Sequence, residues 1–78
     1  MKFTPEHLAQ LNLLLQFDPS STQTGIKVHQ DAAPELKQAA QDLFDLNLCT
    51  LPDGGYLTDE GLVLSEHALK LLHVLESK

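Results

Sequence analysis

The sequence predicts an α+β fold for a single domain spanning residues 1–78, and three observations lead to that class. Leucine supplies seventeen of the apolar residues, against four valines and isoleucines together, which favours helices over strands. Leucines recur at helical spacing near both ends of the chain. Between these ends, Pro52-Asp53-Gly54-Gly55 is a strong turn sequence with short apolar runs on both sides, which indicates a β-hairpin. We therefore expect three main helices, the hairpin and a third short strand.

The first helix is expected over about residues 4–17. Thr4 offers an N-cap hydroxyl, and Pro5 suits the first helical position because its missing N–H would have no helical partner there. One face carries leucines at helical spacing: Leu8, Leu11, Leu14 and Leu15.

Leu13 and Phe17 point to nearly the opposite side of this helix. Two interpretations are open. In the first, Phe17 turns under the polar loop expected over 18–24, and Leu13 is an ordinary exposed leucine. In the second, the two residues belong to a further apolar surface.

A short half-buried strand is expected over 25–29, where apolar and polar residues alternate. Asp31 is a suitable N-cap for a second helix over about 32–46, whose inward stripe holds Leu36, Ala40, Leu43 and Phe44. Asn47 tolerates the left-handed conformation that ends many helices, after which Leu48 can pack back on Leu43.

The last helix is expected over about 59–76, with Thr58 as its N-cap. One broad stripe carries Leu64, Ala68, Leu71, Leu72 and Leu75, whereas Val63 and Val74 lie on another side. Together with the earlier elements, this predicts a core of Leu8, Leu11, Leu15, Leu36, Leu43, Phe44, Leu57, Leu64, Leu72 and Leu75, with Ala68 allowing close helix approach.

The order of these elements resembles a winged helix whose middle helix is missing or reduced to a turn. Two stretches carry the resemblance: Asp42–Leu48 is similar to the end of a recognition helix, and Gly54–Gly61 to the wing and the entry to the next helix. Over its whole length the chain also resembles a small family of uncharacterised bacterial proteins. Some of its members carry a label that links them to an inhibitor of DNA-binding proteins. The resemblance implies a scaffold and leaves the activity open.

Composition argues against several classes of function. The formal net charge is −6 and arginine is absent, a poor composition for gripping phosphate or base edges. The single cysteine, Cys49, suits a reducing compartment. No apolar run approaches the roughly 20 residues that cross a bilayer, and the early acid Glu6 is atypical of a secretory signal. We expect a cytoplasmic protein without membrane contact.

The candidate chemical groups do not form a recognisable catalytic or metal site. His67 and His73 stand six residues apart, whereas two ligands on one helix usually stand three or four apart, and His7 and His29 belong to other elements. Cys49 lies among apolar neighbours, which favours a structural thiol over a nucleophile. We therefore expect no enzymatic activity, no cofactor and no metal.

Two functional hypotheses remain. The first is a protein-interaction or regulatory module that pairs with another protein or with itself as a homodimer, and its expected interface residues are Leu13, Phe17, Val63 and Val74. The alternative is a DNA-binding regulator that uses the helix 34–46 and the wing 48–58, with expected contacts at Lys27, Lys37, Gln38 and Gln41. The acids Glu35, Asp42 and Asp45 in that helix would repel phosphates, which makes the first hypothesis the stronger.

Overall fold

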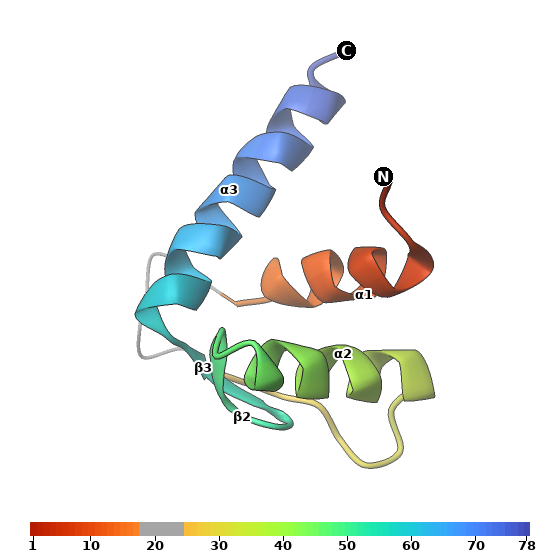
Figure 1. The fold of residues 1–78 in the computed structure, drawn as a ribbon, viewed down its shortest axis with the longest axis vertical. Coiled ribbons are helices and arrows are strands. Elements are labelled where there is room, and N and C mark those ends of the chain that lie inside the picture. Colours follow the sequence, from red (N-terminus) through yellow and green to blue (C-terminus); the bar gives the residue numbers. More distant parts are fainter. Residues whose placement is uncertain (18–24) are drawn as a thin grey trace.

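The computed structural model describes residues 1–17 and 25–78 and confirms the α+β class. The elements follow the chain in the order α1 (Pro5–Leu14), β1 (Ile26–Lys27), α2 (Pro34–Asp45), β2 (Cys49–Leu51), β3 (Gly54–Leu57) and α3 (Asp59–Glu76) (Figure 1). The loop expected over 18–24 lies outside the described residues. The three strands form one antiparallel sheet in the order β1-β3-β2, so the third strand is confirmed.

The start of α1 is confirmed in detail. The backbone N–H of His7 donates to Oγ1 of Thr4 at 3.2 Å, and the backbone N–H of Thr4 donates to Nδ1 of His7 at 3.1 Å. These reciprocal bonds form a capping box in which His7 takes the place usually held by Glu or Gln. The helix ends at Leu14, three residues before the expected end.

The start of α2 differs from the prediction. The helix begins at Pro34 rather than at residue 32, Ala33 holds the N-cap position without a side-chain bond, and Asp31 lies in the preceding turn. Pro34 explains the shift, because its ring disfavours helical backbone at the residue before it. Asp31 is therefore too far upstream to cap the helix.

The end of α2 is as expected. Asn47 has a φ of 63°, and the N–H groups of Asn47 and Leu48 donate to the carbonyl oxygens of Phe44 and Leu43 at 2.9 and 2.8 Å. This is the Schellman pattern of a left-handed helix ending. It turns the chain directly into β2.

The hairpin is confirmed, with Pro52 and Asp53 in its turn and both glycines in β3. β3 is the central strand: Gly54 and Gly55 pair with Lys27 and Ile26 of β1 while β2 pairs on the other side with a shift in register. Gly55 has a φ of +71°, which residues with a side chain rarely adopt.

The start of α3 approaches the end of α2 closely. Thr58 caps α3 by accepting a bond from the N–H of Gly61 at 3.0 Å. A Cβ atom at Gly61 would collide with the carbonyl oxygen of Leu48. The missing side chain of Gly61 is therefore what allows α3 to begin against the end of α2.

The core lies between α1, α2 and the sheet. Its buried members are Leu13, Leu14, Phe17, Val28, Ala39, Ala40, Leu43, Leu48 and Cys49. The predicted core is confirmed at Leu43 and Ala68, which are buried, and partly at Leu36 and Leu57, which pack against the buried cluster.

The rest of the predicted core is exposed or half-buried. Leu11 and Leu15 are half-buried, and the wrong assignments are Leu8, Phe44, Leu64, Leu72 and Leu75. In α1 the error is one of phase, because the side with Ala9, Leu13 and Phe17 faces the core. In α3 the buried side chains are the small ones, Gly61, Ser65 and Ala68, which let the helix lie close to the domain.

The three helices are not packed in one bundle. α1 lies along α2, whereas α3 leaves the sheet at an angle and its far end extends away from the rest of the molecule (Figure 1). The principal extents are 37 × 27 × 20 Å. Among the described residues, no helix combines the length and the apolar character that a membrane crossing requires.

Candidate functional site

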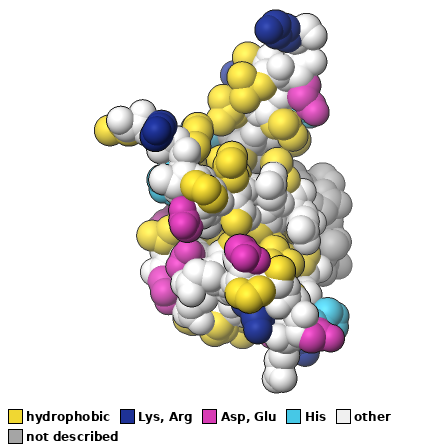
Figure 2. Space-filling view, turned by 90° about the vertical axis from the view of Figure 1, so that its right-hand side faces the viewer, with side chains coloured by type: hydrophobic (Ala, Val, Ile, Leu, Met, Phe, Trp, Pro, Cys, Tyr) yellow, Lys and Arg dark blue, Asp and Glu magenta, His cyan; other side chains and the backbone are white. Residues whose placement is uncertain are grey.

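The most prominent surface feature is a group of leucines on α1 and α3 that the fold leaves exposed or half-buried. We call it the apolar face and define it by Leu8, Leu11 and Leu15 at α1 and by Leu64, Leu71, Leu72 and Leu75 on α3. Figure 2, which looks at the open side between the two helices, shows hydrophobic side chains along the projecting helix and over the body below it.

The part of the apolar face on α3 follows a heptad-like spacing. Leu64, Leu71 and Leu75 succeed one another at intervals of seven and four residues, which is the spacing of a seam that packs against another helix. Ala68, between them, is buried against the domain. Leu71 is 41% exposed and Leu75 is 67% exposed, and residues 71–78 are all exposed. The last turns of α3 therefore carry a packing seam without a partner in the described chain.

The part of the apolar face on α1 lies on the side of that helix away from α2. Pro5, Glu6 and Ala9 line a shallow cavity together with residues of α2, and Gln10 Nε2 donates to Asp42 Oδ2 of α2 at 2.9 Å. At about 100° per residue, Leu8, Leu11 and Leu15 point away from this contact. α3 rises on the side of α1 that is away from α2 (Figure 1).

The total surface shows how much of the molecule is uncovered. A folded monomer of 8.6 kDa is expected to expose about 4,700 Å². This chain exposes 5687 Å², about 1,000 Å² more. The exposed fractions of five leucines of the apolar face add up to about two complete leucine side chains. Burying that much apolar surface would contribute about 3–6 kcal/mol to the free energy of binding. Covering this face would therefore stabilise a complex appreciably.

The interface residues expected from the sequence fall into two groups. Leu13 is 0% exposed and Phe17 is 2% exposed, so their assignment to an exposed surface is wrong. They are buried because their side of α1, and not the side of Leu8, packs on α2. Val63 and Val74 are exposed, at 56% and 61%, and they lie roughly 90° around α3 from the leucine seam.

The leucines of α3 were missed as surface residues. Their regular spacing is the same signal that marks a buried helix face, and it was therefore assigned to the core of this chain. The usable signal was the second stripe on the same helix, formed by the small residues Gly61, Ser65 and Ala68. The stripe of small residues packs against the domain, so the stripe of leucines is left for a partner.

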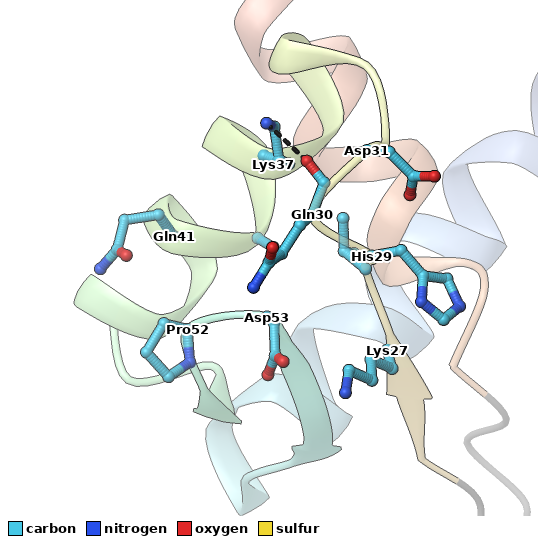
Figure 3. Close-up of a pocket in the computed structure, with 10 residues that line it drawn as sticks. Lys27, His29, Gln30, Asp31, Lys37, Gln41, Pro52 and Asp53 are labelled. Atoms are coloured by element: carbon cyan, nitrogen blue, oxygen red, sulfur yellow. Dashed lines mark hydrogen bonds between the residues drawn. The ribbon is translucent and has the colours of Figure 1, made fainter.

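A second, polar site is a groove of about 900 Å³ between α2, the segment after β1 and the hairpin turn. It brings together three of the four residues expected to contact nucleic acid, Lys27, Lys37 and Gln41 (Figure 3). The fourth, Gln38, lies on another side of α2 and donates to Asp42 Oδ1 at 2.9 Å.

The charges in this groove are mixed. Asp31 and Asp53 line it together with the two lysines (Figure 3). Lys37 is engaged with the groove wall, because its Nζ donates to the carbonyl oxygen of Gln30 at 2.8 Å. The groove therefore offers little net positive charge to a phosphate.

Cys49 is a buried structural thiol, as expected. It is 2% exposed, and its Sγ donates to the carbonyl oxygen of Leu51 at 3.3 Å. Burial raises the pKa of the Cys49 thiol above its ordinary value of 9.0, and the charge of Asp53 raises it further, against a lowering by the backbone of Leu51. Such a thiol is a poor nucleophile at neutral pH.

The histidines are spread over the molecule. His7 belongs to the capping box of α1, His29 lines the polar groove, and His67 and His73 lie on α3. Within residues 1–17 and 25–78, no three His, Cys, Asp or Glu side chains gather in a way that could hold a metal ion.

Comparisons with known proteins give one match. A protein-family model described as a family of unknown function (DUF5669) matches residues 1–76. The expectation of an uncharacterised family is thereby confirmed at that level. No curated protein and no solved structure matches the chain.

Proposed function

The chain belongs to this family of unknown function, and from its own residues we propose that it is a non-enzymatic protein-interaction module. In this proposal the apolar face of α1 and α3 binds a protein partner. The domain formed by α1, α2 and the sheet holds that face in place.

One observation carries the proposal: the leucine seam of α3 is uncovered at the end of the helix that projects from the domain. Large contiguous apolar patches are rare on monomeric proteins and typically mark interaction sites. Leu64, Leu71 and Leu75 recur on one side of one helix, unlike scattered exposed leucines, which need no explanation. A protein partner with an apolar helix or groove fits this surface.

We further propose that the scaffold is winged-helix-like and its role regulatory. The element order supports this, because β1, α2 and the β2–β3 hairpin follow one another as in a winged helix, with the segment 29–33 in the place of a middle helix. The sheet order β1-β3-β2 supports it as well. The resemblance to proteins labelled as related to an inhibitor of DNA-binding proteins suggests regulation through protein contact.

DNA binding is the second candidate, and the polar groove favours it. Lys27, Lys37 and Gln41 share that groove beside α2, the helix in the recognition position. Asp31 and Asp53 in the same groove, and a net charge of −6 for the whole chain, argue against it. We therefore place protein interaction first.

The proposal is tested by affinity capture from a lysate of the source organism with three tagged baits. They are the wild type, the double variant Leu71→Glu/Leu75→Glu, and the control Leu51→Glu, which changes an exposed leucine on the hairpin. We expect the wild type and the control to capture a protein that the double variant does not capture. That protein is either a different protein or untagged copies of this chain. Identical captures by all three baits would contradict the proposal.

A further inference from the structure

We infer that the partner on the apolar face is a second copy of this chain, with the two α3 helices packed antiparallel around a two-fold axis. This inference rests on the proposed function, because it uses the same face, and it adds the identity and orientation of the partner. In the dimer, the projecting end of each α3 lies against α1 and α3 of the other copy.

The shape of the chain leaves enough surface for a dimer interface. Over its whole surface the chain exposes about 1,000 Å² more than a compact monomer of its mass, and a partner in a standard interface buries about 800 Å². Because a two-fold interface uses the same patch on both copies, the apolar face of each chain can cover that of the other. No second apolar patch on another element is needed.

The spacing of the leucines on α3 allows the helices of two copies to pack antiparallel. With a two-fold axis midway between residues 68 and 71, Leu64 of one copy faces Leu75 of the other. Leu71 lies next to this axis, so the Leu71 side chains of the two copies meet near the centre of the contact. The exposed leucines of the two seams therefore pair with one another, while Ala68 stays buried in its own domain.

Charge favours the antiparallel orientation. The first turn of α3 carries Asp59 and Glu60, whereas Lys78 follows its last turn. Antiparallel pairing about this axis places Asp59 and Glu60 of one copy near Lys78 of the other, and it opposes the two helix dipoles. Parallel pairing would place acids beside acids.

The shape of the chain favours the same orientation. The end of α3 extends beyond its own domain (Figure 1), so an antiparallel partner brings its domain to that end. There, the exposed Leu8 and the exposed parts of the half-buried Leu11 and Leu15 of its α1 can cover Leu71 and Leu75 of the first copy. Parallel helices would contact only each other along this end and would leave α1 uncovered.

The orientation is tested by disulfide cross-linking of single-cysteine additions under mild oxidation. We expect Leu64→Cys and Leu75→Cys to form little dimer separately and a covalent heterodimer when mixed. Leu51→Cys, on the hairpin, is the control for cross-linking by random collision. Efficient cross-linking of each variant with itself would show a parallel dimer and overturn the orientation. A cross-linking yield in the mixture no higher than that of Leu51→Cys would overturn self-association.

Sedimentation equilibrium of the wild type over micromolar concentrations tests self-association without any substitution. We expect a reversible dimer, and a dissociation constant raised at least about thirty-fold in Leu71→Glu but unchanged in Leu51→Glu. A wild type that stays monomeric at several hundred micromolar overturns the dimer. The proposed function can hold without the dimer. It does so if the wild type captures a different protein that the variant Leu71→Glu/Leu75→Glu fails to capture.

Discussion

The hydroxyl of Thr58 joins the start of α3 to the end of α2. It donates to the carbonyl oxygen of Asn47 at 2.7 Å and accepts from the N–H of Gly61 at 3.0 Å. Asn47 is the residue in the left-handed conformation that ends α2. One side chain therefore links two helix ends across the hairpin, and it sets the position from which α3 leaves the domain.

Replacing Thr58 by Val should destabilise the protein, because it removes both bonds while keeping the shape of the side chain. We expect a loss of about 1–2 kcal/mol in the free energy of unfolding. Urea unfolding at one fixed protein concentration measures it. Thr58→Ser keeps the hydroxyl and should lose much less; equal losses for Val and Ser would show that the hydroxyl is not responsible.

Gly61→Ala should destabilise the protein although alanine is the better helix former. The intrinsic gain of about 1 kcal/mol is outweighed, because the new Cβ collides with the carbonyl oxygen of Leu48. The expected result is a lower melting temperature in a thermal scan. Glu60→Ala, one residue earlier and exposed, is the matched control. A stabilised Gly61→Ala variant would mean that α3 does not lie this close to Leu48.

The sequence predicted local structure better than packing. Thr4 with Pro5, Asn47 with Leu48, and Pro52 with Asp53 act through neighbouring backbone, so their signals are complete within a few residues. The onset of α2 differs from the prediction because the constraint that Pro34 places on Ala33 outweighs the capping potential of Asp31.

The orientation of the helices was not accessible from the same patterns. α1 carries leucines on both sides, and periodicity does not say whether Leu8 or Leu13 faces α2. For α3, the leucine stripe was assigned to the core, whereas the small residues that face it include Gly61 and Ala68. The sequence therefore placed the expected interface of α3 at Val63 and Val74, which are exposed but lie outside the apolar face, and it did not indicate Leu71 and Leu75 as surface residues.

The buried thiol of Cys49 should make stability depend on pH in the alkaline range. Its pKa is raised in the folded state, so the unfolded chain loses the thiol proton first as the pH rises through about 9. The thiol's contribution to the free energy of unfolding is complete below that pH and falls above it. Urea unfolding at pH 7.5 and pH 10 should show a larger loss in the wild type than in Cys49→Ala. Equal losses would contradict the raised pKa.

Duplex DNA should bind no more tightly than non-specific contacts allow, with a dissociation constant of about 10⁻⁴–10⁻⁶ M at physiological salt. The reason is the mixed charge of the groove, where Asp31 and Asp53 accompany Lys27 and Lys37. Fluorescence anisotropy with random and source-genome DNA measures this. Submicromolar, salt-sensitive binding that is lost in Lys27→Ala or Lys37→Ala would move DNA binding to first place.

The central claim, that a second copy covers the apolar face, is tested most directly by the solvent accessibility of leucine methyl groups. Relaxation caused by a dissolved paramagnetic agent can be measured by NMR from low to several hundred micromolar protein. We expect the methyl groups of Leu71 and Leu75 to become protected as the concentration rises, whereas those of Leu46 and Leu51 stay accessible. If Leu71 and Leu75 remain as accessible as Leu51 at the highest concentration, the claim is wrong.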